Sequence, residues 1–205
     1  MSYSDFQAAI ALAILKPDFV RSLRQGDCPG LEHLELSDKE WRRLRGLAAQ
    51  AGMAFYCSLA RANRLEAIAD AYPMTLVVLE PCLGEFLDRL WTINPPSGYR
   101  FDREIEQFEK AVEAGLADGS LVGGFPYLRE VFRYEQACWS LAASLRESPI
   151  ADAPDTRVVE FEHPPDLLLP PLSRLEAPPP DLPSRSYRVE VSLRGGRFSF
   201  AELPG

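Results

Sequence analysis

Histidine and regularly spaced cysteine are scarce in this 205-residue sequence, and their scarcity argues against several kinds of catalytic and metal site. There are only two histidines, His33 and His163, and they stand far apart. The cysteines are scattered without any CxxC spacing, at Cys28, Cys57, Cys82 and Cys138. Metal clusters and histidine-dependent triads need several such side chains at defined spacing. We therefore predict no metal site, no catalytic residue and no cofactor of the chain's own, with cysteines that are reduced and mostly buried.

The sequence also lacks a long apolar run and an excess of basic charge. No stretch approaches the roughly 18 apolar residues that a membrane-spanning helix requires. The apolar stretch 8–15 follows Ser, Tyr and Asp, so the basic start of a signal peptide is missing. Basic side chains number 22 against 30 acidic ones, whereas nucleic acids and anionic membranes attract basic surfaces. We expect a cytoplasmic protein that binds neither nucleic acid nor membrane.

Helical patterns fill the first three quarters of the chain. Apolar residues at helical spacing predict the longer helices, at 5–15, 83–93, 101–116 and 126–145. Pro17 can begin another helix at its first position. Ser37 and Glu40 form a capping-box pattern ahead of Trp41. Shorter helices are predicted between residues 53 and 79, with a break between Asn63 and Leu65.

The last quarter of the chain has a different composition and predicts a small β module. More than half of the 18 prolines lie within 149–183. Because proline lacks the N–H that a helix requires, the segment 164–183 is expected to be extended. Strands are predicted at 156–162, 186–193 and 197–200, with Gly195 and Gly196 suited to a tight hairpin. The predicted fold class is α+β, with a predominantly helical N-terminal domain (1–148) and a C-terminal antiparallel β module (149–205).

Two further features have both a structural and a functional interpretation. The glycine-rich segment 119–124 lacks the preceding strand and the lysine of a phosphate-binding loop, so it is interpreted as a connection between helices. Glu135 falls within the apolar stripe of the helix 126–145, where a buried carboxylate could act as a general acid or base. The favoured interpretation is an internal ion pair with Arg61 or Arg64. An independent enzyme that uses Glu135 or Cys57 is the least favoured function.

Two sets of residues are candidates for contacts with other chains. Arginine and aromatic side chains anchor many interfaces, so the helix 126–145 offers a candidate partner interface at Tyr127, Arg129, Arg133 and Tyr134. The unpaired backbone of an edge strand can capture an extended peptide. The hairpin is therefore the candidate peptide site, at Tyr187, Arg188, Val189, Glu190, Val191, Ser192, Leu193, Arg197, Phe198 and Phe200. Its arginines could meet acidic residues of the peptide. The alternative is a sheet that only covers the helical core.

Six short motifs follow one another between Phe55 and Leu145. They are Ala60–Asn63, Ala69–Pro73, Gly84–Leu87, Asn94–Gly98, Phe125–Arg129, and Tyr134–Glu135 followed by Trp139. In order and spacing, about half of the chain resembles the helical domain of the DNA-binding-domain family that includes HvfC/BufC and the methanobactin-biosynthesis partner protein. The N-terminal helices and the short proline-rich C-terminus resemble most the stand-alone partner proteins of peptide-modifying systems.

The resemblance implies a function. Such partners form a heterodimer with a multinuclear non-heme iron-dependent oxidase, which holds the iron and the catalytic residues and modifies a ribosomally synthesised precursor peptide. The resemblance therefore implies a non-catalytic subunit that binds the leader of the precursor and presents its core for oxidation. The alternative is a DNA-binding transcriptional regulator, suggested by the name of the family. The net charge of -8 argues against that alternative.

Overall fold

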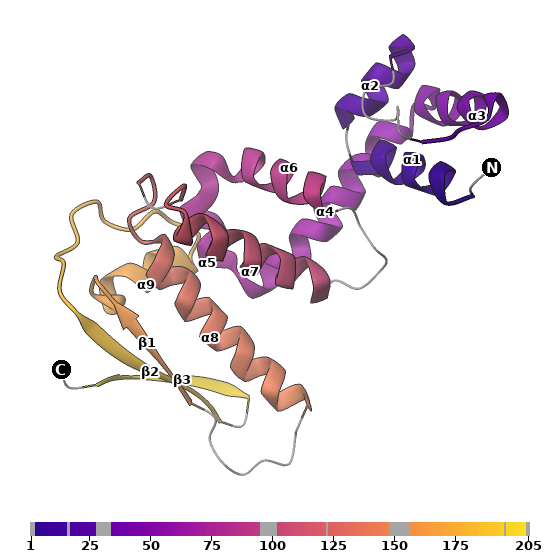
Figure 1. The fold of residues 1–205 in the computed structure, drawn as a ribbon. Helices are drawn as coiled ribbons and strands as arrows, with labels where there is room; N and C mark the ends of the chain where they lie inside the picture. Colours follow the sequence, from indigo (N-terminus) through magenta and orange to yellow (C-terminus); the bar gives the residue numbers. More distant parts are fainter. Residues whose placement is uncertain are drawn as a thin grey trace. The chain divides into compact units, whose positions relative to one another are not determined.

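The computed structural model describes residues 3–15, 17–27, 34–94, 102–121, 123–147, 156–194 and 196–203 (Figure 1). Its helices are α1 (Tyr3–Leu15), α2 (Pro17–Gln25), α3 (Asp38–Ala49), α4 (Met53–Ala71), α5 (Pro73–Leu79), the 3₁₀ turn η1 (Glu80–Cys82), α6 (Leu83–Ile93), α7 (Asp102–Ala117), α8 (Leu128–Glu147) and α9 (Pro165–Ser173). Its strands are β1 (Thr156–Phe161), β2 (Tyr187–Arg194) and β3 (Arg197–Leu203). The predicted α+β fold class is confirmed. None of the described helices is long and apolar enough to cross a membrane.

The chain divides into two compact units, Met1–Ala67 with Phe86–Gln107, and Ile68–Glu85 with Phe108–Gly205. In the first unit, α1, α2 and α3 enclose a small apolar core that includes Ala9, Phe19, Leu23, Leu44 and Cys57. At the start of α3, Ser37 Oγ accepts a hydrogen bond from the N–H of Glu40, whose carboxylate accepts one from the N–H of Ser37 at 2.8 Å. The predicted capping box is confirmed.

The helix α4 runs without a break from Met53 to Ala71, so the predicted interruption between Asn63 and Leu65 is wrong. Residues 54–71 contain no glycine or proline, and six of them are alanine, which favours helix. Nothing in the local chemistry therefore ends the helix early. It ends just before Pro73, which begins α5 at its first position.

The second unit is built around α8. The strands form one antiparallel sheet in the order β1-β2-β3, and the sheet lies along α8 (Figure 1). Val159 and Phe161 of β1, and Val189 and Val191 of β2, point to the same face of the sheet and are buried. They share a core with α8, α5 and α9. The period-two pattern predicted for the hairpin is confirmed, because the alternate residues Arg188 and Glu190 face away from this core.

The expected domain boundary at residue 148 lies outside the described residues. The helix α8 before it and the strand β1 after it belong to the same compact unit. The physical reason is that the sheet buries its apolar face on α8, where Tyr134 and Leu141 belong to the same core. On this face a helix and a sheet complete one core together.

The segment expected to be extended contains the helix α9, so that expectation is wrong for residues 165–173. Pro165 occupies the first helical position, where no helical N–H bond is lost. Pro170 and Pro171 do remove helical bonds, but α9 ends only two residues later. Leu168 and Leu172, one turn apart, are completely buried in the core of the second unit. Their burial offsets the missing bonds.

Candidate peptide-binding groove

The order of the strands decides which backbone groups of the sheet are available to a partner. β2 is the central strand and pairs with β1 on one side and with β3 on the other. The backbone of Tyr187–Leu193 is therefore already engaged and cannot accept an added strand. The free edges, as far as the described residues show, belong to β1 and β3. Of the predicted peptide-binding hairpin, only the β3 half offers an edge.

The side chains of the predicted peptide site divide in the same way. Val189, Val191 and Ser192 are buried, and the hydroxyls of Ser192 and Ser199 lie 2.7 Å apart. Tyr187, Glu190 and Leu193 are partly buried. The fully accessible candidates are Arg188, Arg197, Phe198 and Phe200.

A groove of about 1190 Å³ runs along the other edge of the sheet, beside β1. The end of α7, the start of α8, residues 158–162 and the segment 184–188 that leads into β2 line it. Val158 and Val159, which point to opposite faces of β1, both contribute to the lining. The groove therefore follows the unpaired edge of β1, and Val158 is 49% exposed there.

Charged side chains of both signs line this groove, namely Arg129, Arg133, Arg185 and Arg188 together with Glu113, Glu130, Glu160 and Glu162. Arg133 donates to Glu113 at 3.0 Å and to Gln136 at 2.6 Å. Arg129 and Arg188 are exposed and form no ion pair within the described part of the chain. The guanidinium of Arg185 lies 5.2 Å from the ring centroid of Tyr187. Among the described residues, Arg129, Arg185 and Arg188 form no ion pair within 4 Å, and Glu160 lies directly opposite Arg188 on the neighbouring strand. An extended segment in the groove could therefore form charge-assisted hydrogen bonds with these three arginines.

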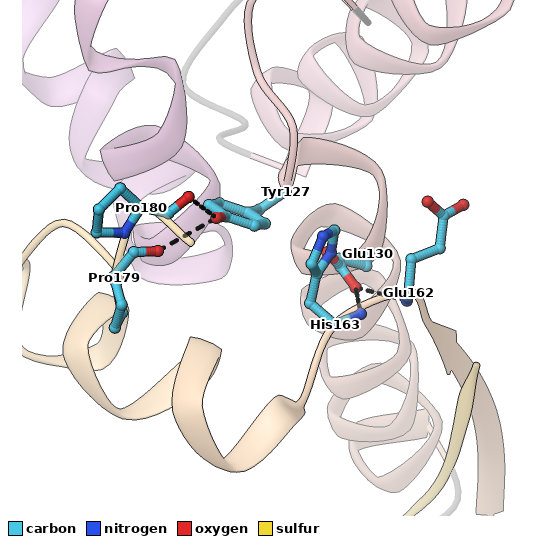
Figure 2. A network of polar contacts seen from close by, with 6 residues as sticks. All are labelled: Tyr127, Glu130, Glu162, His163, Pro179 and Pro180. Atoms are coloured by element: carbon cyan, nitrogen blue, oxygen red, sulfur yellow. Dashed lines mark hydrogen bonds and ion pairs between the residues drawn. The ribbon is translucent and has the colours of Figure 1, made fainter. Parts of the chain in front are cut away.

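One wall of the groove is fixed by Glu130, in the first turn of α8 (Figure 2). Its Oε2 accepts hydrogen bonds from the backbone N–H groups of Glu162 at 2.8 Å and His163 at 3.1 Å. Its Oε1 lies 2.6 Å from Nδ1 of His163. Glu130 is only 5% exposed, so these bonds form away from water. They hold the chain directly after β1 against α8.

Tyr127 continues this network, and its position changes the predicted partner interface. Its hydroxyl donates to the carbonyl oxygens of Pro179 and Pro180 at 3.2 and 3.3 Å (Figure 2). Its ring packs edge-on against His163, with centroids 4.9 Å apart. Tyr127 is buried, and it secures the chain after α9 instead of facing a partner.

Of the other predicted interface residues, Tyr134 is also an interior residue. It packs between Phe161 and Phe200, and burial raises the pKa of its hydroxyl. Arg129 and Arg133 are exposed and line the groove beside β1. The predicted stripe of α8 is likewise mixed, because Leu128 and Phe132 are buried while Trp139 and Ala142 are only half-buried. Two of the four predicted contacts therefore remain on a surface that a partner can reach.

The predicted ion pair of Glu135 with Arg61 or Arg64 is wrong. Arg61 pairs with Asp88, and Arg64 pairs with Glu104 at 2.8 Å. Glu135 instead caps the N-terminus of α5, accepting from the N–H groups of Met74 at 2.7 Å and Thr75 at 2.8 Å and from the Thr75 hydroxyl at 2.6 Å. The N-cap residue Tyr72 supplies no side-chain cap, so the carboxylate of another helix takes that role. Burial raises the pKa of Glu135 to about 7, and the three donors partly offset that rise.

The groups considered for independent catalysis are enclosed. Glu135 is 3% exposed and directs its oxygens to backbone and Thr75 donors. Cys57 is completely buried, its thiol donates to the carbonyl of Ala13, and burial raises its pKa. Cys82 and Cys138 are free, and Cys28 lies outside the described residues. The described residues contain no group of three His, Cys, Asp or Glu side chains that could hold a metal ion.

Fold and site together define a helical protein with a small antiparallel sheet, one edge of which borders a groove lined by arginines and glutamates. No protein-family model matches the chain, and a search of curated proteins gives no match.

No pattern in the sequence assigned a binding role to four residues of the site, which are Glu130, His163, Arg185 and Val158. Glu130 and His163 are 33 residues apart and meet only in the folded chain, so no local pattern could have joined them.

Proposed function

We propose that this chain is a non-catalytic partner subunit that binds an extended peptide along β1. The peptide is the leader of a ribosomally synthesised precursor, and the partner is a multinuclear non-heme iron-dependent oxidase that forms a heterodimer with this chain in the cytoplasm. The observation that supports peptide binding best is the groove beside an unpaired strand edge. The oxidase and its iron enter through the resemblance of the sequence.

Strand addition explains how a peptide would be held in this groove. An added strand would bond through its backbone to β1, next to Val158 and Glu160, and would extend the sheet beyond its three strands. Alternate side chains of that strand would point towards α7 and α8 or towards the outer face of the sheet. Arg129, Arg185 and Arg188 would then recognise carboxylates, which favours an acidic segment.

The mechanism of such a subunit is positioning. A leader held in the groove keeps the core peptide close to the oxidase and raises its effective concentration at the iron site. It also restricts the orientations that the core can adopt, which lowers the entropic part of the barrier to reaction. Neither effect requires a catalytic group on this chain, and the chemistry stays with the oxidase.

The experiment that tests this proposal is affinity capture of the tagged full chain from its native cells, followed by mass spectrometry of the bound proteins and peptides. We expect an iron-containing oxidase in roughly equal amount, together with a precursor peptide whose leader binds the purified chain. Recovery of the chain alone would contradict the proposal. Recovery of duplex DNA in a salt-sensitive complex would support the transcriptional regulator instead.

A further inference from the structure

The second free edge of the sheet, β3, differs chemically from the edge beside the groove. It contains neither proline nor lysine, the residues with which natural proteins often protect an exposed edge. All of its residues except Leu203 are exposed. Phe198 is 41% exposed and Phe200 is 53% exposed, and their rings stack with centroids 6.5 Å apart. An unprotected strand edge with two exposed aromatic rings is suited to pair with a strand of another chain.

We propose that β3 pairs antiparallel with β3 of a second copy of this chain, about a two-fold axis at Ser199. The two three-stranded sheets then form one continuous sheet. In this register Ser199 lies opposite Ser199 of the second copy, and Phe198 lies opposite Phe200 of the second copy. A two-fold contact of this kind uses the same surface on both copies, so the strand must be complementary to itself.

The apolar side chains of β3 satisfy that requirement. Phe198 and Phe200 lie opposite Leu193 and Val191 of β2, so both rings are on the face of the sheet that covers α8. Pairing about Ser199 brings the two rings of each copy together on that face. A shift by one residue would turn the apolar face of one copy outward. A shift by two, which centres the pairing on Phe200, would place Phe198 against Glu202 of the second copy.

The charges at the ends of β3 are compatible with this register. Within one copy, Arg194 lies directly opposite Arg197 at the hairpin end, on the face of the sheet away from α8. Pairing about Ser199 places Arg197 opposite Ala201 of the second copy, and Glu202 opposite Gly196 of the second copy. No like charges therefore lie directly opposite one another across the contact.

A second copy at β3 leaves the groove beside β1 open, because the two strands are at opposite edges of the sheet. The inference therefore stands independently of the peptide proposal. Ser199 is suited to testing it, since the residue is exposed, points away from α8, and lies on the proposed axis. Any charge placed there meets the identical charge of the second copy.

The test is sedimentation of the full chain over a concentration series, with the variants S199K, S199E and T156K. Thr156 lies in the same cross-strand row as Ser199 but on the other edge, so T156K is the matched control. We expect a dimer that S199K and S199E each weaken by about tenfold or more, and that T156K leaves unchanged.

An equimolar mixture of S199K and S199E should dimerise again, because opposite charges then meet on the axis. Circular dichroism of each variant checks that the fold is retained. A wild-type chain that stays monomeric over the whole series would overturn the proposal. So would a dimer that S199K leaves intact, a dimer that T156K weakens equally, or a mixture that does not associate.

Discussion

The two edges of one small sheet differ in what surrounds them. β1 continues into a chain that Glu130 anchors to α8, and its edge faces a groove with arginines. β3 is exposed along its length and approaches α8 through the contact between Phe200 and Tyr134, with centroids 5.7 Å apart. The first edge is a pre-formed, charged site, whereas the second is an apolar strip without walls. The difference favours separate partners for the two edges.

The largest expected effect concerns the anchor of β1. The substitution E130A removes the acceptor of two backbone N–H groups and the partner of His163, all in a site with little access to water. We expect the free energy of unfolding to fall by about 3 kcal/mol or more, measured by chemical denaturation. The matched control is E160A, an exposed glutamate of β1, which should change it by less than about 0.5 kcal/mol. Equal effects of the two variants would show that Glu130 does not anchor β1.

Glu135, the second buried glutamate of α8, sharpens the comparison because it anchors α5 and not the sheet. Its pKa is raised from 4.5 to about 7, so the folded state binds the proton more tightly than the unfolded state. The resulting contribution to the free energy of unfolding is fully present below pH 4.5 and is lost as the pH rises to about 7. Over this range the free energy of unfolding of the wild type should fall by about 3 kcal/mol relative to that of E135Q. Denaturation of both proteins at a series of pH values measures it. If wild type and E135Q follow parallel curves, Glu135 does not titrate in this range.

Charge reversal at the groove gives an intermediate effect. The double variant R129E/R188E should bind the captured leader about 10- to 100-fold more weakly, because acidic residues of the leader would meet repulsion at the rim. Fluorescence anisotropy with the labelled leader measures this affinity. R194E, at the hairpin end of β2, is the control and should leave the affinity unchanged. A loss with R194E of the same size would mean that overall charge, not the groove, governs binding.

The smallest effect is expected at β3. Because only about half of Phe200 is removed from water, F200A should lower the free energy of unfolding by about 1 kcal/mol, measured at concentrations where the chain is monomeric. A fully buried phenylalanine such as Phe161 would cost about 3 kcal/mol or more. A cost of that larger size for F200A would mean that β3 is part of the core and not a free edge.

The sequence predicted those elements whose signals are local. The capping box at Ser37 and Glu40 satisfies its own backbone groups within one turn, and the α+β class follows from periodicity. The hairpin is similarly local, with Gly196 at φ 76° in its turn. The sequence does not predict α9, because the proline density of 164–183 argues against helix and the burial of Leu168 and Leu172 arises only in the folded chain. Pro165 followed by Asp166 was the signal available for its start.

The groove could not be predicted because it depends on contacts between distant segments. Its residues come from α7, α8, β1 and the segment before β2. The sequence placed Arg129 and Arg188 in two separate candidate sites, and the fold brings both to one groove. It also presented Tyr127 and Tyr134 as surface anchors, whereas both pack inside the second unit. Strand order, which no local pattern encodes, places β2 at the centre of the sheet, so that β1 and only the β3 half of the predicted hairpin offer a free edge.

The most direct test of the peptide-binding groove is hydrogen exchange of the full chain with and without the captured leader. The account predicts slower exchange in residues 156–162 on binding, with the amides of 197–203 unchanged. Added protection confined to 197–203 would contradict it and would assign the leader to β3. Binding without added protection in either strand would contradict strand addition altogether.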